Sequence, residues 1–259
     1  MKNYKKIICL TAAVCLLGTA TFCVYHIYDH YAQVEEQTEV FAEIAEMVEN
    51  APTEEETETP DDTPVSEGED ILAKYNELYL QNEDMAGWIS IAGTTINYPV
   101  MQSKNKPDFY LKHNFEKSYS DLGVPYIQEN CDILTSDNLV IYGHHIKGGK
   151  MFGVLENYKS KSFYEEHKTI QFDTLREQAE YEIVAVFKTV AYSPEGFRYY
   201  DFVGAENEDE FNAYIETCKG LALYDTGVNA EYGDRLITLS TCKYSVQNGR
   251  LVVVAKKIN

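Results

Sequence analysis

The chain has 259 residues, and its 42 acidic against 22 basic side chains give a formal net charge of −20. This length suits one domain with appendages or two small domains, and a composition of 44% hydrophobic residues excludes a chain that is disordered throughout. The charge argues against nucleic acid as a partner, because phosphate binding needs clustered Lys and Arg. The acids are unevenly spread: 16 lie in residues 29–70, which contain no Lys or Arg, and residues 71–259 carry a net charge of only −7. We therefore interpret the chain in three parts.

Residues 1–28 have the composition of a cytoplasmic tip and a transmembrane signal anchor. Residues 7–28 contain no charged side chain, and as a helix rising about 1.5 Å per residue they would span the roughly 30 Å hydrocarbon core. Lys2, Lys5 and Lys6 precede this run and predict a cytoplasmic N-terminus. A cleaved signal peptide is the alternative, but the run is longer than a usual signal core and no convincing cleavage site precedes Asp29. We expect a single-pass protein of the cell membrane with its bulk outside the cell.

Residues 29–70 have the composition of an acidic tether. Residues 29–50 keep a helical period of apolar positions with Glu between them. Residues 51–70 are rich in Thr, Glu, Asp and Pro, which predicts a disordered spacer. An interaction tail is one interpretation of this run, and a self-repelling tether that holds a domain off the membrane is the one we favour.

Residues 71–259 form one predicted domain. Residues 71–82 read as a short amphipathic helix, and helical patterns also occur at residues 151–159 and 207–221. Short runs rich in Val, Ile, Tyr and Thr predict strands, and they are residues 87–91, 95–100, 125–127, 139–142, 180–192, 235–239 and 250–256. These elements predict a mainly β domain, a barrel with a few peripheral helices.

The cysteines indicate thiol chemistry more than a disulfide framework. Three of them lie in or beside the apolar run, which leaves Cys131, Cys218 and Cys242 outside, so at least one has no partner within the chain. We interpret Cys131 and Cys218 as structural. The Cys and His spacings do not suggest a zinc site, so we expect no metal and no cofactor.

Two strand ends carry side chains that could do chemistry. The run at residues 138–142 is followed by Gly143 and then by His144 and His145. A second run ends at Cys242, and Arg250 opens the next one after a polar turn, so the two strands can pair as a hairpin with Arg250 beside Cys242. Each of these residues alone is more often a packing or surface residue than a catalyst. A strand end is nevertheless a rigid place from which to present a functional side chain.

Together these motifs resemble the class B sortases, cysteine transpeptidases of Gram-positive bacteria. The resemblance rests on Leu-Ser-Thr-Cys ending at Cys242 with Arg250 eight residues on, and on Tyr-Gly-His ending at His144 with Met151 and Phe152 after it. It extends over nearly all of residues 71–259 through three further segments, residues 82–91, 93–102 and 109–115. It implies a mainly β fold with peripheral helices: an eight-stranded sortase-type β-barrel, an N-terminal helix and a helix in the connection before the catalytic Cys strand.

The resemblance also implies that Cys242, His144 and Arg250 are catalytic. His144 is chosen over His145 because the family's catalytic His directly follows the Gly; the reverse assignment is the alternative. A thiolate would be the nucleophile, and an imidazolium at His144 would favour it and later protonate the departing amine. Arg250 would aim fixed donors at an oxyanion or a substrate carbonyl. The motifs do not indicate a third residue that orients His144.

Substrate contacts follow from the same resemblance. Ser240, two residues before Cys242, should share a sheet face with it. Leu111 resembles the residue that packs the peptide's apolar side chain. Tyr199 and Tyr200 lie where the family's specificity region is found. Ordinary barrel packing is the alternative for the tyrosine pair. The implied partners are secreted proteins with an LPxTG-like or NPxTx-like sorting signal, and a cell-wall amine from a peptidoglycan precursor or cross-bridge.

Three other functions remain open at this point. A membrane-tethered cysteine protease would use the same three residues with water resolving the thioester, and a pilin-linking sortase would use a different acceptor. A non-catalytic surface-binding barrel is the third. The sorting motif and the acceptor amine are not determined by these motifs.

Overall fold

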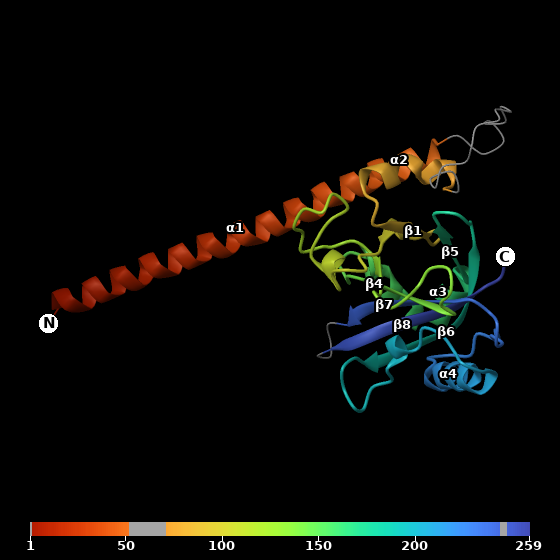
Figure 1. Ribbon diagram of the computed structural model, residues 1–259. Helices are drawn as coiled ribbons and strands as arrows, with labels where there is room; N and C mark the ends of the chain where they lie inside the picture. The colour runs from red at the N-terminus through yellow and green to blue at the C-terminus, as the bar shows by residue number, and fades with distance from the viewer. Residues whose placement is uncertain (1, 52–70, 244–247) are drawn as a thin grey trace. The chain divides into compact units, whose positions relative to one another are not determined.

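The computed structural model describes residues 2–51, 71–243 and 248–259. The chain divides into two compact units, residues 1–43 and 44–259. Helix α1 (Lys2–Glu49) runs without a break from the apolar segment into the acidic one (Figure 1). Its first half exposes apolar side chains such as Ile7, Leu10 and Leu17, and it is long and apolar enough to cross a membrane, as signal sequences near an N-terminus also are. The spacer predicted for residues 51–70 lies, from residue 52 onward, outside the described residues.

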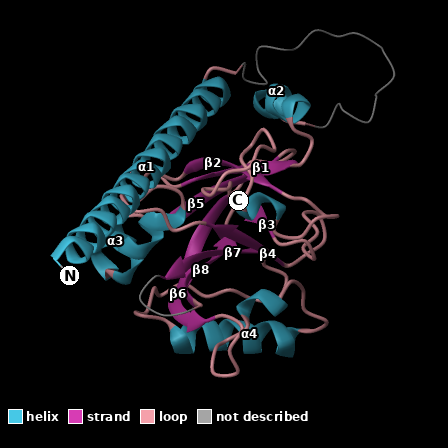
Figure 2. Ribbon diagram, turned by 90° about the vertical axis from the view of Figure 1, so that its left-hand side faces the viewer, coloured by secondary structure: helices cyan, strands magenta, loops and turns pink. Residues whose placement is uncertain are grey.

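Eight strands close into one barrel, in the order β1-β2-β3-β4-β7-β8-β6-β5 (Figure 2, magenta). The strands are β1 (Met85–Ser90), β2 (Asn97–Met101), β3 (Tyr126–Ile127), β4 (Asn138–Gly143), β5 (Thr169–Thr174), β6 (Glu180–Val190), β7 (Leu236–Lys243) and β8 (Gly249–Lys257). The pairs β2–β3 and β4–β7 are parallel, and the other pairs are antiparallel. The predicted eight-stranded barrel is confirmed.

Short helices precede the barrel or connect its strands. They are α2 (Ala73–Gln81), α3 (Lys161–Glu166) and α4 (Glu208–Leu221), with 3-10 turns η2 (Phe109–Leu111), η3 (Phe152–Lys159) and η4 (Tyr199–Asp201). The predicted helices at residues 71–82 and 207–221 are therefore α2 and α4. Residues 152–159 are helical as expected, but they form a 3-10 helix, and α3 follows as a further turn.

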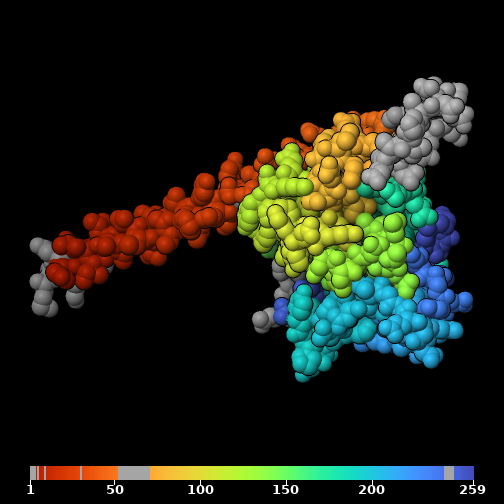
Figure 3. Space-filling model, in the orientation of Figure 1, coloured from red at the N-terminus to blue at the C-terminus, as the bar shows by residue number. Residues whose placement is uncertain are grey.

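Helix α4 begins at a side-chain cap. The Asn207 side-chain oxygen accepts the backbone N–H of Glu210 at 3.0 Å, and Glu208, Asp209 and Glu210 fill the first turn, where the helix dipole favours negative charge. The helix buries Phe211 and its neighbours on the inner face and lies beside β6 on the outside of the barrel (Figure 2). In Figure 3 the cyan segment that carries η4 and α4 forms the lower surface of the domain. The connection before β7 is thus a packed helical layer.

Strand β5 is absent from the strands expected from sequence. Its apolar content is limited to Ile170 and Phe172, and it contains Asp173, a residue type depleted in strands. The structure buries Asp173 because the Tyr75 phenol (2.8 Å) and the Lys74 ammonium (2.7 Å) of α2 both contact its carboxylate. Tertiary pairing of this carboxylate with α2 therefore makes the strand possible.

Candidate active site

Three neighbouring strands bring the expected catalytic positions to one end of the barrel. In the parallel pair β4–β7, Gly143 is in register with Thr241, so His144 follows β4 at the level where Cys242 follows Thr241 in β7. In the antiparallel pair β7–β8, Cys242 is in register with Arg250. Strands β7 and β8 are buried through their middle residues, which places them in the barrel wall with little freedom to shift. The backbone positions of His144, Cys242 and Arg250 are therefore neighbours.

The turn that carries His144 is shaped by one glycine. A Cβ on Gly143 would lie 2.5 Å from Cγ of the Phe152 ring, closer than two carbon atoms can approach. Phe152 is fully buried, and its backbone N–H donates to the His144 carbonyl at 3.0 Å. The spacing of Tyr-Gly-His and Met-Phe in the sequence thus has a packing reason: the Phe152 ring fills the space that the glycine leaves.

The His144 ring is held by a backbone carbonyl. Its Nε2 lies 2.7 Å from the Leu111 oxygen, and a carbonyl has no proton to donate, so this hydrogen bond requires a proton on Nε2. In the neutral ring Nδ1 is then the unprotonated nitrogen and the one able to accept a proton. The sequence indicated no orienting group for His144, because a main-chain carbonyl leaves no trace in residue type.

Burial lowers the pKa of His144. Desolvation is the largest cause of the lowering, and the Lys112 ammonium adds to it. The hydrogen bond to the Leu111 carbonyl and the Asp121 carboxylate act in the opposite direction and raise the pKa. Lys112 and Asp121 are themselves an ion pair at 2.7 Å, and their effects on the pKa of the ring oppose each other. Because the ordinary pKa is already 6.5, the lowered value favours a neutral imidazole at pH 7. The loss of water around the ring thus works against the imidazolium expected from sequence, and the protonation state that the reaction uses stays a prediction.

Arg250 lies half-buried at the start of β8. Its Cα is in register with Cys242 on one side and with Thr189 of β6 on the other. One guanidinium nitrogen donates to the Gly249 carbonyl at 3.1 Å. A guanidinium has five N–H donors in a fixed plane and stays charged at any physiological pH, so Arg250 can direct positive charge and donors at this end of the barrel.

Three of the expected substrate contacts lie together. The Tyr199 hydroxyl and the Ser240 hydroxyl form a 2.6 Å hydrogen bond, and both residues are buried. The Tyr200 ring lies 5.3 Å from the Tyr199 ring, and its hydroxyl accepts the backbone N–H of Tyr192 at 3.3 Å. Tyr199 thus makes the packing contacts of a core residue, while Tyr200 is half-buried. A substrate role for these three residues stays a prediction.

Leu111 lies apart from that group, beside the histidine. Its side chain is half-buried in η2, and its described contact with the site is the carbonyl that His144 reaches. A role for its side chain in packing a peptide stays a prediction. Sequence reasoning did not single out Asp108, which directly precedes η2, or Tyr126, whose hydroxyl donates to the Asp108 carboxylate at 2.7 Å. An Asp before a helical turn and a Tyr in a short strand carry no motif that would mark them.

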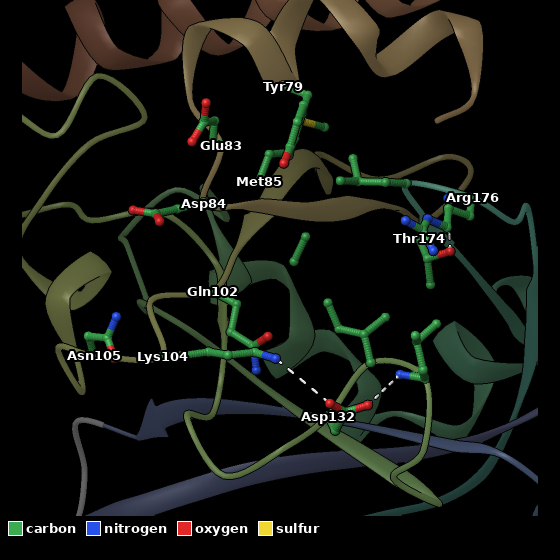
Figure 4. A pocket seen from close by; sticks show the side chains of 14 residues that line it. Tyr79, Glu83, Asp84, Met85, Gln102, Lys104, Asn105, Asp132, Thr174 and Arg176 are labelled. Atoms are coloured by element: carbon green, nitrogen blue, oxygen red, sulfur yellow. Dashed lines mark hydrogen bonds and ion pairs between the residues drawn. The ribbon is translucent and has the colours of Figure 1, made fainter. Parts of the chain in front are cut away.

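A cleft of about 540 Å³ lies where β1 begins and β5 ends, lined in part by Met85 and Thr174 (Figure 4). Tyr79, Gln102 and Arg176 line it, and Lys104 faces Asp132 across it at 3.7 Å. Its wall mixes both signs of charge, which gives it no evident ligand. Among the described side chains, no group of three or more His, Cys, Asp or Glu is arranged to hold a metal ion, and metal independence stays a prediction.

Two cysteines of the domain are buried, free thiols. Burial raises the pKa of Cys131 to about 11 and that of Cys218 to about 12. Both therefore stay protonated at neutral pH, and a protonated thiol is a poor nucleophile.

A closed mixed barrel with a Cys, a His and an Arg at neighbouring backbone positions defines the framework of a β-barrel thiol enzyme. The family model for the sortase domain matches residues 89–258. Sortase B of Staphylococcus aureus is 34% identical over 193 residues, covering 73% of this chain and 77% of its own length. Sortase B of Listeria monocytogenes is 33% identical over 192 residues, covering 73% and 76%. This chain belongs to the sortase family, in class B.

Solved structures agree with this assignment. Sortase B from Bacillus anthracis, in complex with the compound AAEK1, superposes with a TM-score of 0.73 at 29% identity, covering 88% of this chain and 99% of that one. The Staphylococcus aureus sortase B–substrate complex superposes with a TM-score of 0.73 at 28% identity, covering 88% and 99%.

Proposed function

We propose that this chain is a membrane-anchored cysteine transpeptidase that cleaves a C-terminal sorting signal after Thr and transfers the surface protein to a cell-wall amine. The observation that carries the proposal is the register of Cys242 with Arg250, with His144 following the parallel neighbour strand at the same level. Membership of the sortase family supports the reaction type. We propose the three domain boundaries given above, with residues 71–259 as the catalytic domain.

In the acylation step, the Cys242 sulfur attacks the threonine carbonyl carbon and its proton passes to Nδ1 of His144. The lowered pKa of His144 supports this order, because a neutral imidazole can act as a general base. Arg250 donates to the oxygen on which negative charge develops. The carbon–nitrogen bond then breaks, His144 returns the proton to the leaving amine, and a thioester remains on Cys242.

In the second step an amine resolves the thioester. Its nitrogen attacks the thioester carbon while His144 takes a proton from it, the carbon–sulfur bond breaks, and His144 passes that proton to the departing sulfur, which restores the thiol. The new amide joins the surface protein to the amine of a peptidoglycan precursor or cross-bridge. We propose that α1 holds the enzyme in the membrane with its N-terminus in the cytoplasm, where the positive charge before the apolar run favours it.

The test uses the full chain, purified in detergent, with peptides that carry an LPxTG-like or an NPxTx-like sequence. Each peptide is offered with a glycine-type amine and with a diamino-acid amine, and the products are weighed by mass spectrometry. We expect an amide product that depends on the amine, and an adduct on the wild-type thiol that Cys242→Ala lacks. Hydrolysed peptide alone with every amine would contradict the transpeptidase and favour the protease; full activity of Cys242→Ala would contradict both. Joining only to the lysine of a pilin-type peptide would favour the pilin-linking enzyme.

A further inference from the structure

We propose that Asp108 and Tyr126 are positioning residues for His144, acting through the η2 turn that carries Leu111. This rests on the proposed function, in which His144 moves the proton. The two residues lie outside the three catalytic positions, and their effect would reach the reaction only through the placement of one backbone carbonyl.

The first step concerns that carbonyl. The Leu111 oxygen lies 2.7 Å from Nε2 of His144 and so determines both the orientation of the ring and which nitrogen carries the proton. Its location depends on η2, a turn of three residues that has little stability of its own. The turn also starts from an unfavourable backbone conformation, because Asp108 has a φ of +56°, in the left-handed region. Such a turn keeps its shape only when neighbouring groups hold it.

The second step concerns what holds the turn. The Tyr126 hydroxyl donates to Oδ1 of Asp108 at 2.7 Å, and the Asp108 carbonyl accepts the Leu111 N–H at 3.0 Å. Further along, the Val124 N–H donates to the Tyr110 carbonyl at 3.0 Å. Residues 123–126 therefore lie alongside η2 along its whole length.

Gly123 brings that segment close enough to the turn. A Cβ there would lie 2.4 Å from the Tyr110 oxygen and 2.8 Å from the Leu111 oxygen, the same oxygen that His144 contacts. Gly123 also has a φ of +58°, which a residue with a side chain adopts only with strain. The segment thus packs directly against the orienting carbonyl.

The third step is that the same strands hold the histidine. Tyr126 is in register with Tyr142 in the pair β3–β4, and Tyr142 is two residues before His144. One continuous path therefore runs from β4 through Tyr126, Asp108 and the Leu111 carbonyl back to the ring of His144. Tyr126 is buried, and burial together with the Asp108 carboxylate raises its pKa, so its hydroxyl remains a donor.

The test measures the pKa of His144 directly. In the full chain in detergent, with labelled histidine assigned against His144→Gln, the imidazole nitrogens are titrated by NMR, and kcat and KM for peptide cleavage are measured over the same pH range. The variants are Tyr126→Phe, which removes the donor, Asp108→Ala, which removes the acceptor, and Asp108→Asn, which keeps an acceptor oxygen and tolerates the left-handed backbone. Tyr164→Phe, which removes from α3 a tyrosine hydroxyl that donates to the Thr226 carbonyl at 3.2 Å, is the matched control. The Lys112–Asp121 ion pair, which also acts on the ring, is unchanged in all four.

We expect Tyr126→Phe and Asp108→Ala to lower the pKa of His144, because a looser carbonyl stabilises the charged ring less. We expect each to lower kcat by about threefold to tenfold, the size of one hydrogen bond, with KM unchanged. Asp108→Asn and Tyr164→Phe should behave as wild type. A wild-type His144 pKa in Tyr126→Phe would overturn the proposal. If Tyr126→Phe does not fold, the same His144 pKa and the same kcat in Asp108→Asn and Asp108→Ala would overturn the proposal. If the wild-type chain cleaves no sorting peptide, the proposed function is wrong, but the comparison of His144 pKa values between the variants still tests the positioning role.

Discussion

The hydroxyl groups of Tyr199 and Ser240 form a 2.6 Å hydrogen bond that ties η4 to β7, two residues before Cys242. Both residues are about 1% exposed, so a sorting peptide could contact either one only after a movement that exposes it. The bond therefore bears both on the stability of the barrel and on the predicted substrate contacts.

A double-mutant cycle on this pair separates the two roles. Tyr199→Phe and Ser240→Ala each leave one buried hydroxyl without its partner, and we expect each to reduce the free energy of unfolding by about 1–2 kcal/mol. The double variant should cost less than the sum, because it removes both groups. Chemical denaturation measures the cycle. An increase in KM for the sorting peptide in Ser240→Ala alone would support a substrate contact, and unchanged KM in all three would contradict it.

Gly143→Ala tests the packing of the histidine turn. The new methyl group would overlap the Phe152 ring, and we expect a loss of about 1–3 kcal/mol in the free energy of unfolding, together with reduced activity. Gly220→Ala is the matched control, because no atom lies within 4 Å of a Cβ at that position in α4. That control should be neutral or should stabilise the helix by up to about 1 kcal/mol. Equal thermal midpoints for the two variants would contradict the overlap.

Arg250→Lys tests the predicted oxyanion donor. Lysine keeps the charge but loses the planar set of donors, and we expect kcat/KM to fall by about 10²-fold with little change in stability. Arg235→Lys, whose wild-type guanidinium donates to the Ile133 and Leu134 carbonyls just before β7, is the control and should retain activity. Steady-state cleavage of a sorting peptide makes the comparison. A decrease of the same size in both variants would point to a general loss of structure.

The lowered pKa of His144 makes a prediction about pH. As a general base, His144 must be neutral, so kcat/KM should rise with pH through a pKa below 6.5 and level off above it. A rate that instead falls as pH rises through that range would indicate an imidazolium requirement and contradict the base assignment.

The same shift affects stability with a definite sign. The folded state binds its proton less readily than the unfolded state, whose pKa is about 6.5. The wild-type protein should therefore lose stability relative to His144→Gln as pH falls from 6.5 through the lowered pKa. Above 6.5, where both states are neutral, the difference should be constant. Denaturant titrations of the two proteins at several pH values measure it.

Most elements of the domain could be predicted from residue patterns. Short runs rich in Val, Ile, Tyr and Thr marked seven of the eight strands, and a helical pattern at residues 207–221 marked α4. The motifs ending at Cys242 and His144, with Arg250 after the polar turn, marked the positions that the barrel brings together, although the strand predicted at residues 235–239 ends before β7 does.

Tertiary structure decided the rest. Strand β5 exists because α2 supplies partners for the buried Asp173, and a sequence window around residues 169–174 does not contain those partners. The orientation of His144 depends on a carbonyl 33 residues earlier in the chain, and the lowering of its pKa depends on burial. Residue types and spacing thus determined which side chains could do the chemistry. Only folding decided how they are oriented and charged, because hydrogen bonds to the main chain and the exclusion of water arise between segments that are distant in sequence.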